Sequence, residues 1–119
     1  MRTMKPKPRH LGPDYGAQFQ DPSVAAVYRK RPPYPPELFD LLCELLPQPS
    51  KARILELGAG TGEVAIPLAE RVASLDAVEV SEPMLDVAAT QPGYDRVHWH
   101  RQSAESFAYT SIYDLIICA

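Results

Sequence analysis

Apolar residues along the chain fall into short runs that alternate with stretches of helical spacing. Residues 53–57 form a mostly aliphatic run that stops abruptly at a glycine, which is typical of a parallel strand buried on both faces. Similar runs predict strands at 75–79, 96–100 and 113–118. After the first run, residues 63–73 predict a helix, because apolar positions recur on one face: Val64, Ala65, Leu68, Ala69 and Val72. Strands that alternate with helices predict a parallel sheet.

The first third of the chain is expected to be less regular, because ten of the 13 prolines lie in residues 1–49. A helix is predicted over 37–46, since prolines precede it, five leucines form its apolar face and Pro47 stops it. A shorter helix is expected from Ser23. The pattern predicts a disordered or extended basic arm at 1–22, a helical, proline-rich lead-in at 23–50, and an α/β region at 51–119.

Three glycines, Gly58, Gly60 and Gly62, follow the first predicted strand at a spacing of two. Glycine allows a positive φ and a close approach of the backbone to a ligand, and free amides at a helix start attract electron-rich groups. The dinucleotide fingerprint has a glycine where this chain has Glu63, and Glu56 favours a ligand with a cationic end. A tight connection in any α/β domain is the alternative. The predicted fold class is therefore α/β: a Rossmann-like parallel sheet between two helical layers (a three-layer αβα arrangement). The sheet is expected to be truncated after its fourth strand.

An acidic residue ends the second predicted strand. Glu79 lies 21 positions after Gly58, where a carboxylate that binds the two ribose hydroxyls of a nucleotide belongs. A solvated carboxylate at a strand end is the alternative. Ser81 is the predicted N-cap of the next helix, which ends before Pro92. Pro67 predicts a kink or a late start in the helix after the glycines.

The third predicted strand carries His98 and His100 on one face and Trp99 on the other. The two imidazoles have no third ligand at a suitable spacing, so a structural role is favoured and no metal site is predicted. Trp99 is expected to pack in the core. With only Cys43 and Cys118 there is no disulfide framework, which favours a cytoplasmic location.

Charge is distributed unevenly along the chain. Residues 1–31 hold seven basic residues against two acidic ones, and the remainder holds five basic and 13 acidic residues. The α/β region therefore lacks a basic face for nucleic acid, and the basic start is expected to be solvated, with RNA or anionic lipid as alternatives. The first 12 residues lack the apolar stretch of a signal peptide, and no run is long enough to span a membrane.

Four motifs, in this order, resemble those of the class I S-adenosylmethionine-dependent methyltransferases. Residues 56–62, Glu-Leu-Gly-Ala-Gly-Thr-Gly, resemble the first motif of that family, and residues 78–85 resemble the acidic-x-Ser-x-x-Met-Leu stretch after its second strand. Residues 102–105 occupy the place of the adenine-binding segment, and 113–119 resemble the fourth strand. The resemblance covers about residues 25–119, so 51–119 would be the N-terminal half of a methyltransferase domain.

The resemblance implies S-adenosylmethionine as cofactor. The glycine turn would seat its methionine portion, Glu79 the ribose, and Val80, Met84, Ala104 and Glu105 the adenine. Ser103 stands where the family has an acid, which weakens the expected bond to the adenine amino group, and core packing is an alternative role for Met84. The predicted cofactor-binding residues are Tyr28, Arg31, Glu56, Gly58, Ala59, Gly60, Thr61, Gly62, Glu79, Val80, Met84, Ala104, Glu105 and Cys118.

The lead-in at 28–35 resembles the Tyr-x-x-Arg-Pro-x-Tyr-Pro segment of small-molecule methyltransferases related to the trans-aconitate enzymes. In such enzymes this segment folds over the cofactor, so Arg31 is expected to pair with the methionine carboxylate, with Tyr28 as its packing partner. A solvated basic turn is the alternative. The implied reaction is methyl transfer to a small-molecule acceptor by in-line displacement, and no residue is assigned as general base.

The last predicted strand ends the chain and would expose an unpaired edge. This edge predicts association with a partner or a second copy, and the short length predicts marginal stability. Two other functions stay open: a non-catalytic cofactor-binding or assembly module that another chain completes, and a nicotinamide-dependent oxidoreductase fragment. Glu63 and Glu56 disfavour the oxidoreductase.

Overall fold

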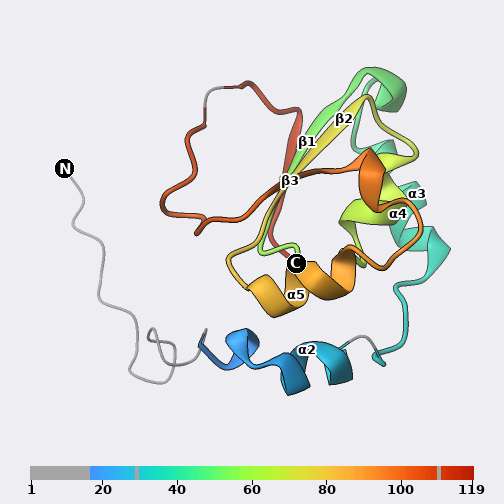
Figure 1. The fold of residues 1–119 in the computed structure, drawn as a ribbon. Coiled ribbons are helices and arrows are strands. Elements are labelled where there is room, and N and C mark those ends of the chain that lie inside the picture. The colour runs from blue at the N-terminus through green and yellow to red at the C-terminus, as the bar shows by residue number, and fades with distance from the viewer. Residues whose placement is uncertain (1–16, 29, 110) are drawn as a thin grey trace, which may run out of the picture.

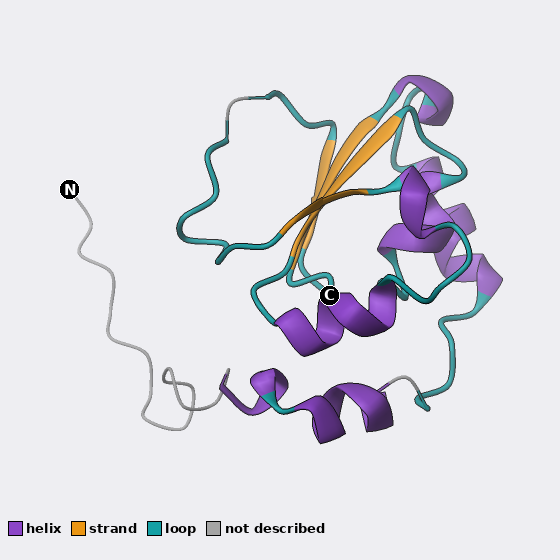
Figure 2. Cartoon of the chain, in the orientation of Figure 1, coloured by secondary structure: helices purple, strands orange, loops and turns teal. Residues whose placement is uncertain are grey.

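A computed structural model describes residues 17–28, 30–109 and 111–119. Its centre is a parallel sheet of four strands in the order β3-β2-β1-β4, drawn in Figures 1 and 2. The sequence predicted each strand, although three are shorter or shifted by one residue. The Rossmann-like α/β fold is thus confirmed. The strands are β1 (Arg53–Leu57), β2 (Ser74–Val78), β3 (His98–His100) and β4 (Leu115–Ile117).

The helices are short. The predicted helix at 37–46 begins at Pro36 and ends at Glu44, and the predicted arm at 1–22 contains a 3-10 turn in its described part. Residues 1–16, on which most of the prediction of a basic arm rests, lie outside the described residues. The helices are η2 (Gln18–Gln20), α2 (Pro22–Tyr28), α3 (Pro36–Glu44), η3 (Pro49–Lys51), α4 (Ala65–Ala69), α5 (Glu82–Ala88) and η4 (Tyr94–Arg96).

Local sequence signals explain where α4 and α5 begin. The helix expected over 63–73 starts late, at Ala65, which puts Pro67 in the first turn, where a missing amide hydrogen leaves no helical bond unmade. Ser81 caps α5 as predicted: its hydroxyl accepts a hydrogen bond from the backbone N–H of Met84. Both helices therefore start at the end of the sheet where β1 and β2 finish.

The two faces of the sheet are covered differently. Ile54, Leu75 and Ala77 pack against α3 and α4 in one large buried cluster, to which Trp99 adds its indole. The opposite face has a small cluster of Leu55, Val78 and Phe107, and residues 101–109 and 111–114 form the loop beside it (Figure 1). The indole of Trp99 also donates a hydrogen bond to the carbonyl of Tyr94. The helix-covered face is thus the better packed of the two.

The N-terminal segment lies against the strand ends. In Figure 1, α2 runs alongside α5, below the ends of the strands. The hydroxyl of Ser81 donates to the carbonyl of Phe19, and the amide of Gln20 donates to the carbonyl of Val80 at 3.4 Å. Within the described ranges, no helix has the length and apolar character needed to cross a membrane. These contacts bring the lead-in to the glycine turn.

Candidate functional site

The glycine turn joins β1 to α4 at the carboxyl ends of the strands. Gly58, Gly60 and Gly62 have φ values of 73°, 60° and 89°, in the left-handed region that favours glycine. The backbone N–H groups of Gly58 and Ala59 donate to the carbonyl of Val78 at 2.8 and 3.1 Å, which fixes the turn to the end of β2. A Cβ added at Gly58 would meet nothing within 4 Å. The turn is therefore open on that side.

The carboxylate of Glu79 links the glycine turn to the start of α5. One carboxylate oxygen accepts the backbone N–H of Gly60 at 2.8 Å, and the other accepts that of Ser81 at 2.8 Å. The side chain is only 9% exposed. Each carboxylate oxygen has two lone pairs, so both keep the capacity to accept a further hydrogen bond.

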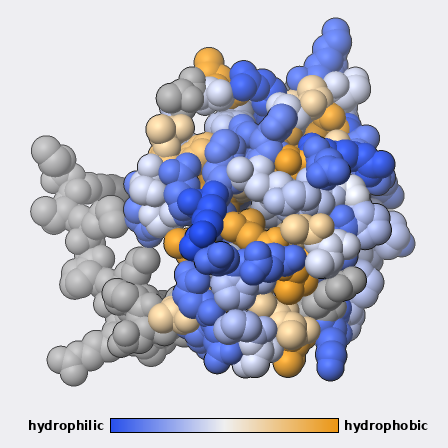
Figure 3. Space-filling model, in the orientation of Figure 1, coloured by the Kyte–Doolittle hydropathy of each residue, from blue (hydrophilic) through white to orange (hydrophobic). Residues whose placement is uncertain are grey.

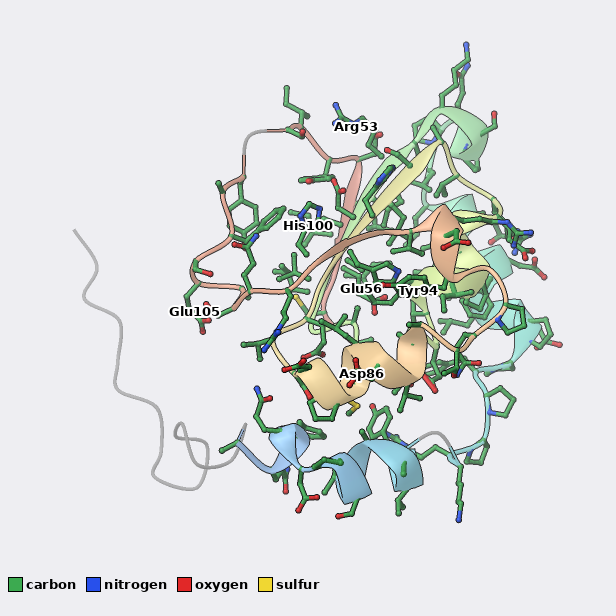
Figure 4. The ribbon with its side chains drawn as sticks, in the orientation of Figure 1. Arg53, Glu56, Asp86, Tyr94, His100 and Glu105 are labelled. Carbon is green, nitrogen blue, oxygen red and sulfur yellow. The ribbon has the colours of Figure 1, made fainter. Side chains whose placement is uncertain are left out.

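Glu56 is a buried acid in β1. Its side chain is 2% exposed, and its Oε2 atom has no hydrogen-bond partner among the described residues. Burial raises the pKa of Glu56 to about 8, with smaller contributions from the carboxylates of Glu63 and Glu79. The acid is therefore mostly neutral at pH 7. Figure 4 shows Glu56 on the side of the sheet that α3 and α4 cover, near the strand ends.

Thr61 and Glu63 form a contact that the sequence analysis missed. The hydroxyl of Thr61, 1% exposed, lies 2.6 and 2.5 Å from the two carboxylate oxygens of Glu63 and donates to them. In the sequence, Glu63 stood out only because it replaces a glycine of the dinucleotide fingerprint. The two-residue separation was the available signal, since hydroxyl and carboxylate side chains at this spacing bond locally in turns.

The lead-in reaches the glycine turn. A Cβ on Gly60 would lie 3.9 Å from the ring of Tyr28, and the guanidinium of Arg31 lies 4.7 Å from the centre of that ring. A cavity of about 420 Å³ adjoins the turn. It is lined by Arg31, Pro33, Thr61, Gly62, Glu63, Ile66, Pro67, Gln91 and Pro92. Of these, Gln91 and Pro92 lie outside every segment that predicted a site.

A second polar cluster lies on the opposite face of the sheet. Asp76 accepts the hydroxyl of Tyr113 at 2.7 Å, and its other oxygen lies 3.1 Å from Nε2 of His100. His100 thus contacts a carboxylate of the neighbouring strand β2. In the described part of the chain, no group of three or more His, Cys, Asp or Glu is placed to hold a metal ion.

Comparison with known proteins decides the family. The sequence profile of the family described as methyltransferase domain matches residues 54–119, which is more than half of the chain and begins inside β1. The chain belongs to the class I S-adenosylmethionine-dependent methyltransferases. S-adenosylmethionine is the cofactor of this family.

Relatives of this methyltransferase are considerably longer than the chain. An uncharacterized methyltransferase of Mycobacterium tuberculosis is 46% identical over 65 residues, 55% of this chain and 25% of the relative. The malonyl-[acyl-carrier protein] O-methyltransferase of Bacillus cereus is 33% identical over 82 residues, 67% of this chain and 30% of that protein. The chain thus matches less than a third of the length of either relative.

A solved structure, the CcbJ methyltransferase from Streptomyces caelestis, superimposes with a TM-score of 0.64. It is 32% identical and the match covers 80% of this chain and 41% of that one. A methyltransferase from Thiobacillus denitrificans, in complex with S-adenosyl-L-homocysteine, has a TM-score of 0.57 at 22% identity, and covers 73% of this chain and 37% of its own. The second comparison concerns the fold alone.

The remaining predicted residues of the methyltransferase are spread more widely. Val80 is half exposed beside Glu79, whereas Met84 is 2% exposed within α5, as the core alternative expected. Ala104 accepts the hydroxyl of Tyr109 at 3.2 Å through its carbonyl. Glu105 lies exposed at the outer bend of its loop, away from Glu56 in Figure 4, and Cys118 is exposed after β4. The structure thus gathers the turn, Glu79, Val80 and the lead-in, but not Glu105.

Proposed function

We propose that this chain is the cofactor-binding half of a methyltransferase that acts on a small molecule. The observation that carries the proposal is the pair of buried acids at adjacent strand ends, Glu56 and Glu79, on either side of the glycine turn. Glu56 has a carboxylate oxygen without a partner among the described residues, and both oxygens of Glu79 can accept a further hydrogen bond. A ligand with an ammonium group and a ribose diol satisfies both.

Different residues of the chain would bind different parts of the cofactor. The glycine turn would hold the methionine portion, since Gly58 leaves its ligand side open. Glu79 would accept the ribose hydroxyls, and Arg31, already ordered on the ring of Tyr28, would pair with the carboxylate. Val80, Met84, Ala104 and Glu105 stay predicted adenine neighbours, and Cys118 a predicted contact. When bound, the cofactor supplies an electrophilic sulfonium methyl group.

The cavity next to the turn supports a small-molecule acceptor. Its volume of about 420 Å³ falls within the usual range of small-ligand sites. Ile66 and the prolines form apolar walls, which suit an organic molecule with a few polar atoms. The polar groups of the lining are Arg31, Thr61, Glu63 and Gln91. Rate enhancement would come mainly from holding donor and acceptor at attack distance. The B. cereus relative is named for a carrier-bound acyl acceptor, which is a second acceptor class to assay.

Isothermal titration of S-adenosylhomocysteine into the purified chain tests the proposal, with NAD as the competing cofactor. Glu79→Ala should weaken binding about tenfold or more, because hydrogen bonds to a charged acceptor contribute about 1.5–3 kcal/mol. Glu44→Ala, an exposed acid on α3, is the matched control and should bind like the wild type. Equal binding by Glu79→Ala and wild type, or tighter binding of NAD, would contradict the proposal.

A cytoplasmic location and the lack of a nucleic-acid partner stay predictions.

A further inference from the structure

Three carboxylates surround the glycine turn at close range. Glu56 lies below it in β1, Glu63 follows it, and Glu79 projects from the end of β2. Two of them are occupied: Glu79 accepts two backbone amides and Glu63 accepts the hydroxyl of Thr61. Only Glu56 has a buried carboxylate oxygen without a partner among the described side chains. The cluster therefore has one unmet polar group, and it belongs to the most buried acid.

Among the residues that the structure describes, no positive charge offsets Glu56. On its own face of the sheet, its strand neighbours are Ala77 and Ile117, and α4 contributes no ionisable residue. The groups that act on its carboxylate are Glu63 and Glu79, both of the same sign. Arg31, the cation that lines the adjoining cavity, lies over the ring of Tyr28 instead. A charged Glu56 would be buried among like charges.

We infer that Glu56 carries a proton in the free protein and releases it when the ammonium end of the cofactor binds. An ammonium group brings the positive charge that the turn lacks and supplies donors to the orphaned oxygen. Ionisation of Glu56 then costs less than burial of an unpaired ammonium. The step balances: the Glu56 O–H bond breaks, the proton passes to solvent, and carboxylate and ammonium form a neutral pair. This inference rests on the proposed function.

The expected size of the effect follows from the pKa of Glu56, which burial raises to about 8. At pH 7 about nine-tenths of Glu56 is protonated, so binding should release about 0.9 proton per ligand. Affinity should then rise about ninefold from pH 6 to pH 7 and about fivefold from pH 7 to pH 8. Glu56 thus makes the site select a cationic ligand and couples its occupancy to pH.

The test is calorimetric binding of S-adenosylhomocysteine at pH 6, 7 and 8, repeated in buffers with different ionisation enthalpies. The buffer dependence of the heat counts released protons directly. Glu56→Gln, a neutral isostere of the protonated acid, should release fewer than about 0.2 proton at pH 7 and lose the pH dependence of affinity. Glu63→Gln should still release a proton, with a lower midpoint, because one of the like charges is removed. Glu44→Gln should match the wild type.

A second measurement, an NMR titration of Glu56 itself, tests the same inference independently. The side-chain carboxyl carbon of Glu56, followed by NMR, should titrate with a midpoint near 8 in the free chain and below about 6 when saturated with S-adenosylhomocysteine. Binding without proton release, or an unchanged midpoint on saturation, would overturn this inference and leave the proposed function standing. No binding of S-adenosylhomocysteine by the folded chain at any of these pH values would overturn both.

Discussion

Gly58 and Gly62 have similar backbone conformations and different surroundings, so the same substitution should have different effects. Both have a positive φ, 73° and 89°. A Cβ at Gly58 would point into open space, whereas one at Gly62 would lie 2.7 Å from Cδ1 of Ile66 and 3.1 Å from Cη2 of Trp99. Ile66 is 8% exposed and borders the cavity, whereas Trp99 packs against the buried cluster. Alanine at 62 therefore meets both strain and overpacking.

The two variants should differ in how much free energy of unfolding they lose. A left-handed conformation costs an alanine roughly 1–2 kcal/mol, which applies at both positions. Overpacking of a well-packed core adds about 1–3 kcal/mol at Gly62 alone. Gly58→Ala should thus lower the free energy of unfolding by about 1–2 kcal/mol and Gly62→Ala by about 2–5 kcal/mol. For a small domain this second loss is a large share of about 5–15 kcal/mol.

Urea unfolding at 25 °C, followed by far-UV circular dichroism and by fluorescence of the single tryptophan, Trp99, measures both variants. Binding of S-adenosylhomocysteine is a second readout. Gly58→Ala fills the open side of the turn and should weaken binding about tenfold. Equal losses of stability, within about 0.5 kcal/mol, would refute the argument from packing.

Two further predictions concern the opposite face of the sheet. Burial raises the pKa of Asp76, but hydrogen bonds from Tyr113 and His100 outweigh it, so the net pKa is lowered. Such a carboxylate stabilises the fold above its unfolded pKa near 4 and loses this effect as pH falls through its lowered folded pKa. In urea titrations, Asp76→Asn should therefore be less stable than wild type at pH 6 and approach it as the solution is acidified, and parallel pH profiles would count against the cluster. We also propose that β4, which in the described structure pairs with β1 alone, associates through its free edge. Figure 3 shows that apolar surface lies among the hydrophilic residues on one face of the molecule. The mass from sedimentation should rise with concentration and fall back in Ile116→Lys, a change at a half-exposed residue of β4, and a strict monomer at all concentrations would exclude the association.

Local signals in the sequence determined much of this protein. The order and type of the strands follow from aliphatic runs, and the turn from glycines that only a positive φ explains. The cap at Ser81 and the acid at the end of β2 were both predicted, because each depends on neighbours within a few residues. Element ends were less accurate: the helix expected over 63–73 is five residues long, since Pro67 delays its start and glycine precedes it.

The tertiary structure alone decided which groups are buried and what they meet. Asp76 contacts Tyr113 and His100, which lie 37 and 24 residues away, and no local pattern encodes such pairs. The sequence placed Glu56 before the turn. Its unpartnered oxygen and raised pKa arise from burial on the helix-covered face and from the carboxylates of Glu63 and Glu79 nearby. Burial and Coulomb interactions depend on distance in space, and parallel strands bring residues close that the sequence keeps far apart.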